Sequence, residues 1–254
     1  MNPIVQILLA YILILFIIAV SQKENLGQEK EVFFTSLRCS FQLLLLGFTL
    51  KFVFSLKSWY WLILLLSIMT GAAAFIGAER LKIKASKLYA LKVCFLSLFI
   101  STALVFVPLL LIGAIHNTLR EVLTLWGLVL GNSVSSLSLA YDRLVAESFN
   151  RKDEVEAKVA LGATLKQALK ECIKPAVEAS LIPKYNSLKS AGIVFIPGIT
   201  AGMIIAGADP LTAVVYQILV MYMILATSFF TAYLLVLFTC EKAFASCIYL
   251  QTKK

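Results

Sequence analysis

Charged residues are scarce in this sequence of 254 residues, since Asp, Glu, Lys and Arg make up only 15% of it. Soluble domains carry about 25% of these residues, whereas apolar residues here reach 60%. This composition cannot supply the polar shell that a soluble fold needs, and it therefore excludes one. It predicts an all-α membrane protein, organised as a single polytopic transmembrane domain over residues 1–254.

Metal-binding and catalytic motifs are also missing. The sequence has one histidine, His116, and its five cysteines form no CxxC pair, so we expect no zinc site and no bound metal. It contains neither HExxH nor GxSxG, and we expect that the chain is not an enzyme. A GxxxxGK[ST] phosphate loop is absent too, so the chain has no usual means of binding ATP.

Long apolar runs are the main feature that is present. About 20 mostly apolar residues are needed to cross the hydrocarbon of a bilayer as a helix. The sequence predicts about seven such transmembrane helices. Their expected ranges are 3–20, 32–54, 59–78, 93–115, 121–140, 188–207 and 211–238.

The connections between these runs differ sharply in charge. Of the 23 Lys and Arg residues, 18 fall in 21–31, 79–92, 141–186 and the tail after 238, and only three on the opposite side. Lys and Arg accumulate in cytoplasmic loops, which places the N-terminus outside and the C-terminus in the cytoplasm. The net charge of +9 is then explained by these loops, and we expect no nucleic-acid partner.

Two GxxxG motifs and two prolines lie inside the predicted spans. Glycines four residues apart form a groove that lets another helix approach closely, either within one chain or between two copies in a homodimer. Pro108 and Pro197 are expected to kink their helices, and a break at Pro197 would lie near a transport path. The glycines of the two motifs are Gly127, Gly131, Gly198 and Gly202.

The stretch 141–186 is the only long polar connection, and its pattern suggests short amphipathic helices on the membrane face. It resembles the EAA loop of ABC-transporter permeases, because Ala157 follows Glu156 and a glycine and a proline stand six and nineteen residues after that glutamate. Lys158 and Lys174 depart from the pattern. The resemblance implies a coupling helix that docks into a separate ATPase subunit, through Glu156, Ala157, Leu161, Gly162, Ala163 and Pro175.

A longer resemblance covers most of the chain. The residues that carry it include Leu181, Pro183, Ser187, Gly192, Pro197, Gly198, Gly202, Gly207, Asp209, Pro210, Tyr216, Gln217 and Met223. Through such residues the region 161–226 is similar to the FetB-type permeases, a bacterial family assigned to iron export, with plant relatives linked to aluminium tolerance and nucleotide-sugar transport. The resemblance implies two permease copies in the bacterial inner membrane, with two ATPase subunits that bind ATP and magnesium.

Five polar residues inside the predicted spans are candidates for a translocation pathway, because ionisable and polar groups are costly in lipid. Alternatively, the cations snorkel to the interface and the amides bond neighbouring helices. Asp209 is expected to form a turn rather than to bind a ligand. The five candidates are Arg38, Gln42, Asn132, Lys189 and Gln217.

The transported species is less well specified than the family. Ferrous iron prefers imidazole, carboxylate or thiolate ligands, whereas Arg38 and Lys189 suit an anionic or phosphate-bearing substrate. A chelated metal would satisfy both. Another class of transporter, a secondary carrier driven by an ion gradient, would usually show inverted repeats and acidic residues at mid-membrane, and neither is clear in this sequence.

Overall fold

The computed structural model describes residues 3–53, 59–81, 86–116 and 118–251, and within these ranges regular structure is entirely helical. A single isolated β-bridge, between Ala191 and Phe195, is the exception among the described residues. The chain divides into two compact units, residues 1–57 and 58–254. Five cations counted above for orientation lie outside the described residues: Lys57, Lys82, Lys84, Lys253 and Lys254.

The first unit is a hairpin of two apolar helices, α1 (Pro3–Lys23) and α2 (Glu29–Val53). Ser21 Oγ donates to Glu29 Oε1 at 2.7 Å, which joins the end of α1 to the start of α2. Further along, Tyr11 Oη donates to Ser40 Oγ at 2.9 Å. These polar contacts fix the pairing of two helices whose other surfaces are largely exposed and apolar, as lipid-facing helices require.

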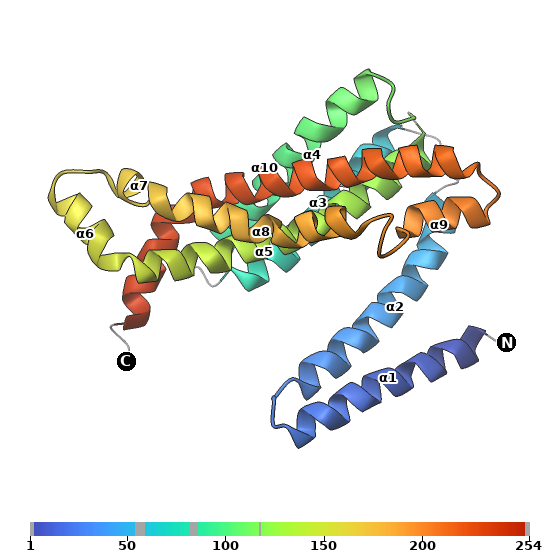
Figure 1. Cartoon of the computed structure of the whole chain (residues 1–254), viewed down its shortest axis with the longest axis horizontal. Coiled ribbons are helices and arrows are strands. Elements are labelled where there is room, and N and C mark those ends of the chain that lie inside the picture. Colours follow the sequence, from blue (N-terminus) through green and yellow to red (C-terminus); the bar gives the residue numbers. More distant parts are fainter. Residues whose placement is uncertain (1–2, 54–58, 82–85, 117, 252–254) are drawn as a thin grey trace. The chain divides into compact units, whose positions relative to one another are not determined.

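The second unit is a bundle in which α5, α8 and α10 lie side by side, while α4 packs against α10 and α3 packs against α4 and α5 (Figure 1). The short helices α6 and α7 lie at one end of this bundle and α9 lies at the other. The bounds are α3 Trp59–Arg80, α4 Lys87–Leu111, α5 Leu119–Asn150, α6 Lys152–Ala160, α7 Leu165–Ala168, α8 Lys170–Ser190, α9 Gly198–Ile205 and α10 Pro210–Gln251.

Two long-range hydrogen bonds define the ends of this bundle. Tyr216 Oη, near the start of α10, donates to Glu121 Oε1 at 3.0 Å, near the start of α5. Tyr89 Oη, near the start of α4, donates to the Phe238 carbonyl of α10 at 2.7 Å. Helices α5 and α10 therefore run parallel, and α4 runs antiparallel to both.

Small hydroxyl side chains line the helix contacts of this unit. Ser101 on α4 shares a hydrogen bond with Thr231 on α10, and both are fully buried. On the other side of the bundle, Trp126 Nε1 donates to Thr70 Oγ1 at 3.1 Å, and the indole packs on Phe106 with ring centroids 5.2 Å apart. Small polar residues allow close helix approach in lipid, where hydrophobic burial drives association only weakly.

The membrane class predicted from composition is confirmed at the level of individual helices. Within the described residues, five helices are long and apolar enough to cross a bilayer: α2, α3, α4, α5 and α10. Helix α1 is apolar as well, and its apolar segment Leu9–Lys23 is shorter than those of the other five. Most boundaries agree within a few residues, although α4 begins at Lys87 rather than at 93.

The expected span at 188–207 is wrong. Helix α8 ends at Ser190, a turn follows, and the eight-residue helix α9 begins only at Gly198. The Ser190 carbonyl accepts a hydrogen bond from Val194 N at 2.8 Å, and Gly192 N donates to Phe195 O at 3.0 Å. The apolar run 193–196 is therefore folded into turns, so its hydropathy does not mark a continuous helix. Pro197 is the N-cap of α9 and not a kink within a span.

The expected loop at 141–186 is also wrong over much of its length. Helix α5 continues to Asn150, and α8 is a 21-residue helix that packs lengthwise on α5 and α10. Four charged residues in its first half lower the hydropathy of α8, and its two internal prolines, Pro175 and Pro183, resemble loop residues in sequence. Only α6 and α7 match the short helices that were expected.

Candidate functional site

The turn after α6 depends on a glycine. Ala163 N donates to Lys158 O and Gly162 N donates to Val159 O, both at 3.0 Å. These two bonds form a Schellman motif, in which the residue after the C-cap is left-handed. Gly162 has φ of +95°, a region that costs other L-residues about 1–2 kcal/mol. Helix α6 therefore ends in a turn at Gly162.

The next helix begins directly after this turn with a capping box. Gln167 N donates to Thr164 Oγ1 at 3.3 Å, and Thr164 N donates to Gln167 Oε1 at 2.9 Å. Two backbone donors at the start of α7 are thereby satisfied. Residues 152–168 form a tight hairpin of two short helices, called here the α6–α7 hairpin, whose turn is held by bonds between near neighbours in sequence.

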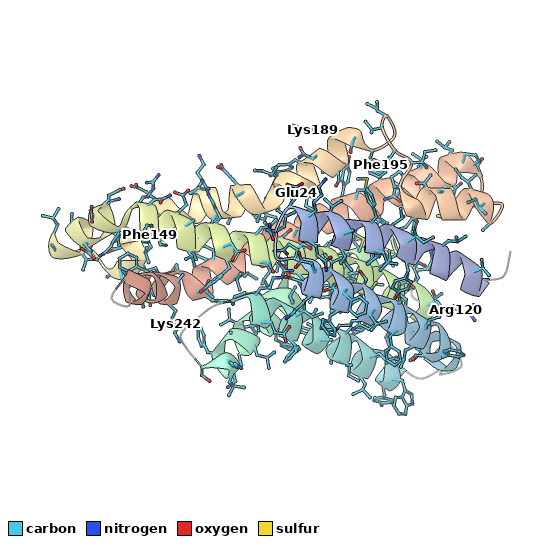
Figure 2. All side chains as sticks on the ribbon, turned by 90° about the horizontal axis from the view of Figure 1, so that it is seen from below. Glu24, Arg120, Phe149, Lys189, Phe195 and Lys242 are labelled. Carbon is cyan, nitrogen blue, oxygen red and sulfur yellow. The ribbon has the colours of Figure 1, made fainter. Side chains whose placement is uncertain are left out.

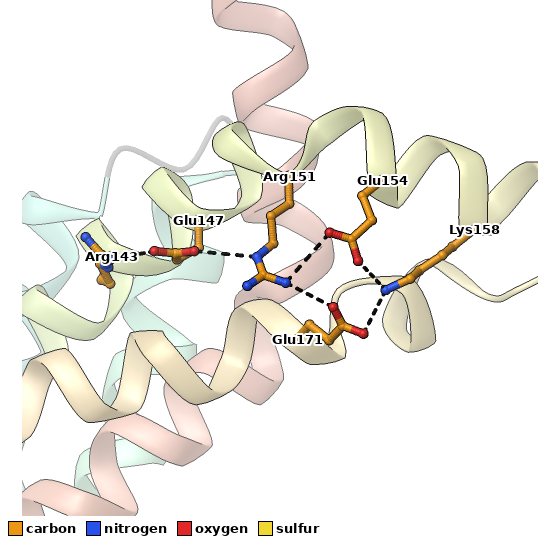
Figure 3. A network of polar contacts seen from close by, with 6 residues as sticks. All are labelled: Arg143, Glu147, Arg151, Glu154, Lys158 and Glu171. Carbon is orange, nitrogen blue, oxygen red and sulfur yellow. Dashed lines mark hydrogen bonds and ion pairs between the residues drawn. The ribbon is translucent and has the colours of Figure 1, made fainter.

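Ion pairs fasten this hairpin to the start of α8 (Figure 3). Glu171 Oε2 lies 2.9 Å from Arg151 Nη1, and its Oε1 lies 2.9 Å from Lys158 Nζ. Glu154 contacts the same two cations, at 2.6 Å from Lys158 Nζ and 3.7 Å from Arg151 Nη1. Because Lys158 and Glu154 lie on α6 and Glu171 lies on α8, the network holds the two helices at a defined angle.

The network continues into α5 through Glu147, which is buried. Its Oε1 lies 2.6 Å from Arg143 Nη2, and its Oε2 lies 3.7 Å from Arg151 Nε. Arg151 is the residue between α5 and α6, so one guanidinium contacts three elements. The hairpin is thus connected by charge to the helix that enters the membrane.

Hydrogen bonds within the network favour the charged forms of its members. The pKa of Glu171 is held below its ordinary value, chiefly by the hydrogen bond from Lys158. The pKa of Lys158 is raised above its ordinary value, first by its hydrogen bond to Glu154 and then by that to Glu171. Both groups are surface groups, so these pairs orient the hairpin and contribute little to global stability.

The hairpin presents an apolar tip. Leu161 is 89% exposed at the turn, while Val155, on the inner side of α6, is 1% exposed. Leu161 has charged residues on both sides of it along the chain. The tip of the hairpin therefore exposes a large aliphatic side chain between charged stretches of the chain.

The structure brings together most of the residues predicted for ATPase coupling. Glu156, Ala157, Leu161 and Ala163 lie on α6 or in its turn, beside Gly162. Glu156 points to solvent, 3.6 Å from Lys152 Nζ. Pro175 lies apart from them, within α8.

The residues predicted for the translocation pathway do not form one cluster in the second unit. Asn132 Oδ1 accepts a hydrogen bond from Lys184 Nζ at 2.8 Å, across α5 and α8. Gln217 is 8% exposed, and its Oε1 has no hydrogen-bond partner among the described residues. Since Glu121 contacts Tyr216, Asn132 lies about 15 Å further along the bundle than Gln217.

The other three pathway candidates are exposed. Lys189 lies near the end of α8, and Phe195 follows it in the turn before α9 (Figure 2). Arg38 and Gln42 share a face of α2 in the first unit. Their part in a pathway stays a prediction.

The GxxxG glycines have different surroundings. A Cβ at Gly127 would lie 2.6 Å from the Met69 side chain, so this glycine permits the close packing of α5 on α3. Gly131, Gly198 and Gly202 have no described atom within 4 Å of a Cβ built on them. They are open to lipid or to a second copy.

Sequence reasoning missed two polar contacts. Lys184 was counted as a loop cation, because α8 was not expected to be a helix of the bundle. Glu121 was counted as the edge of a span, yet it contacts Tyr216 Oη and lies 3.2 Å from His116 Nδ1. No group of three or more His, Cys, Asp or Glu side chains that could hold a metal ion occurs in the described part of the chain.

Comparison with known proteins identifies a family and several relatives. The family model described as uncharacterised protein family UPF0014 matches residues 4–244. The Escherichia coli protein named probable iron export permease FetB is 31% identical over 220 residues, covering 87% of this chain and 84% of that protein. No solved structure matches.

Two further relatives extend the range of organisms. The Synechocystis UPF0014 membrane protein slr1647 is 34% identical over 83% of this chain and 82% of its own. The Arabidopsis protein ALUMINUM SENSITIVE 3 is 30% identical over 86% of this chain and 79% of its own. With the multiple apolar helices described above, these matches show that the chain is a membrane protein of the UPF0014 family, the family of the FetB permeases.

Proposed function

We propose that this chain is the membrane-spanning permease subunit of an ABC transporter, which exports iron or another metal species with energy from a separate ATPase subunit. The observation that carries the proposal is the α6–α7 hairpin, with Leu161 exposed at its tip. Its helix end at Gly162 and the ion pairs of Glu171 make a rigid lever between a soluble partner and α5. A coupling element must transmit movement in this way without bending.

The direction of the chain follows from its charges. If α8 and α9 together make one crossing, seven crossings place α6, α7 and the C-terminus on the same side. The cations Arg151, Lys158 and Lys170 are on that side, and by the positive-inside preference it is the cytoplasm. The hairpin then faces an ATPase in the cytoplasm of a cell whose inner membrane holds the permease.

Assembly as a homodimer with two ATPase copies is part of the proposal. The two open glycines of α9, Gly198 and Gly202, offer a face where a second helix fits closely. ATP and magnesium would bind the partner subunits, since this chain has no phosphate loop.

The proposed substrate class, a metal, rests on the name of the Escherichia coli relative, probable iron export permease FetB. An anionic or nucleotide-sugar substrate is the second candidate, and a specific contact favours it. Lys184 is half-buried and is held by Asn132 between α5 and α8, where a cation can meet a negative group entering the bundle.

The decisive experiment is the ATPase rate of the purified permease–ATPase complex in lipid, titrated with ferrous iron, other divalent metals, anionic chelates and a nucleotide-sugar. Stimulation by iron or a chelate supports metal export. Stimulation by a nucleotide-sugar alone supports the second candidate. The ABC assignment fails if no soluble ATPase co-purifies with the chain and if variants of the α6–α7 hairpin, such as Gly162→Val, transport normally.

A companion test separates the pathway from the coupling site. Arg38→Ala is expected to lose transport while it keeps ATPase binding. Full transport by this variant would return Arg38 to the role of a cation that snorkels to the interface.

A further inference from the structure

A groove of about 780 Å³ runs between α8 and α10, next to the α6–α7 hairpin. Its walls come from two antiparallel helices, so it follows the long direction of the bundle (Figure 1). One end carries three lysines, and apart from Thr164, Gln167 and Glu178 the rest of the lining is aliphatic or aromatic. The groove shares Thr164, Lys166 and Gln167 with the α6–α7 hairpin, but it does not include Leu161 at the tip of the hairpin.

The basic end is formed by Lys166, Lys170 and Lys174, which are exposed and spaced four residues apart. Lys170 and Lys174 lie one turn apart on α8, and Lys166 lies on α7 just before it, so the three form a row of lysines across two helices. Lys166 and Lys170 make no ion pair with any described residue, and Lys174 Nζ lies 3.8 Å from the Glu178 carboxylate. The row therefore keeps an excess of positive charge at the mouth of the groove.

The apolar walls begin directly beyond the lysines. On α8 a neighbouring row consists of Ile173, Val177 and Leu181, again four residues apart, whereas the lysine spacing itself continues to Glu178. On α10 the facing row includes Phe229 and Tyr233, whose rings stack with centroids 6.2 Å apart. The pairing of a cationic mouth with a long apolar floor makes the groove amphipathic.

A second hollow of about 350 Å³ extends the apolar part. It shares Leu181, Tyr185 and Phe229 with the first and continues to Tyr222 on α10. From Leu237 to Phe229 the helix rises about 12 Å. One leaflet of hydrocarbon, roughly half of a core about 30 Å thick, has a similar depth, so the groove is long enough to hold most of an acyl chain.

We propose that this groove binds an anionic phospholipid of the cytoplasmic leaflet. The three lysines contact the negative headgroup, and one acyl chain lies along α8 and α10 between Leu181 and Phe229. The leaflet follows from the proposed orientation, while the choice of an anionic lipid follows from the charge of the groove alone. Basic pockets between transmembrane helices on the cytoplasmic side recognise such headgroups.

The position of the groove gives the lipid a structural consequence. Its basic end includes Lys166 of α7 and Lys170 at the start of α8, so an occupied groove fastens the base of the hairpin to α10. A bound lipid therefore stiffens the lever on which coupling depends, and anionic lipid content should alter how firmly α7 is held.

The test uses the full chain without any ATPase, so that its outcome is independent of the proposed function. The purified protein is mixed with phosphatidylglycerol or cardiolipin, and in parallel with phosphatidylcholine, and retained lipid is counted by native mass spectrometry. We expect anionic lipid to be retained and zwitterionic lipid to be lost. The variant Lys166→Gln/Lys170→Gln/Lys174→Gln should weaken retention roughly 100-fold, since each lysine near an anionic surface contributes about a factor of five.

The matched control removes three exposed cations from the same side but outside the groove, as Arg80→Gln/Lys87→Gln/Lys92→Gln. It should retain anionic lipid like the unmodified chain. A second variant, Ala226→Trp, fills the apolar extension and should reduce retention with all three lysines present.

Three results would overturn the proposal. Equal retention of anionic lipid by the triple variant and its control would show that the three lysines do not bind the headgroup. Displacement of lipid by millimolar inorganic phosphate would show that the groove binds a soluble anion. Disulfide cross-linking of two copies through Tyr233→Cys, in membranes rich in anionic lipid, would assign the groove to a homodimer contact.

Discussion

The two ends of the α5–α8–α10 bundle use the same backbone device in opposite surroundings. At one end α6 stops in a Schellman motif at Gly162, and at the other α9 stops in the same motif at Gly207, with φ of +91° and with Ala208 N bonded to Met203 O. Each of these helix ends exposes a large aliphatic side chain almost completely. Leu161 is 89% exposed and Ile205 is 87% exposed.

The difference lies in the charges around each tip. The α6 tip is surrounded by the ionic network of Arg151, Lys158 and Glu171, whereas α9 contains no charged residue. An exposed apolar side chain among charges is in water and is available to a protein partner. The same side chain among apolar residues is satisfied by lipid, so exposure alone does not identify a docking site in a membrane protein.

The largest effect expected from this comparison is at the tips themselves. Leu161→Asp should weaken binding of the ATPase subunit about 30-fold, because an anchor at the centre of an interface contributes about 2 kcal/mol or more. Ile205→Asp should leave that affinity unchanged and instead lower the amount of inserted protein. Binding is measured by titration in detergent, and insertion by membrane fractionation. Equal loss of ATPase binding in both variants would show that the two ends of the bundle do not differ in their role in docking.

Strain at the two glycines should give the next largest effect. Gly162→Val places a β-branched residue at positive φ and should reduce ATP-driven transport about tenfold, since the local cost of roughly 1–2 kcal/mol distorts the lever. Insertion should be normal. Gly207→Val carries similar strain at the other end, and transport by it should fall much less. Normal transport by Gly162→Val would contradict the coupling assignment.

Removal of one partner in the ionic network should have a smaller effect. Glu171→Gln breaks the contacts that join α6 to α8, and amide exchange in 152–160 should become several-fold faster while exchange in α9 stays unchanged. Glu178→Gln is the matched control, because Glu178 lies on the same helix and contacts only Lys174 among the described residues. Unchanged exchange in α6 would show that the hairpin is held by its turn alone.

The smallest expected effect is a pH dependence of that same exchange. The pKa of Glu171 is lowered in the folded protein by its hydrogen bond from Lys158, so its contribution is present above the ordinary glutamate pKa. It is lost as the pH falls through the lowered value. Exchange in α6 should therefore rise on acidification below the ordinary glutamate range, and Glu171→Gln should flatten this rise. An identical pH profile in both proteins would exclude Glu171 as its source.

Several turns of this structure are specified by local sequence. The helix end at Gly162 and the turn at Asp209, whose Oδ2 accepts from Thr212 N at 3.0 Å, depend on bonds between residues at most five apart. Such bonds form wherever the residue types allow them, so their positions could be predicted. The mistaken span at 188–207 arose because hydropathy measures how apolar a run is and not whether its backbone continues as a helix.

The sequence by itself determined that this protein lies in the membrane, because its composition permits no water-facing shell, and it determined where the α6–α7 hairpin turns. Only the tertiary structure decided that α8 packs along α5 and α10 despite its charges and prolines. Lys184 and Asn132 meet across 52 residues of sequence, and the groove between α8 and α10 is formed only when these two helices lie together. Contacts of this kind depend on the packing of whole helices, which no local pattern of residues specifies.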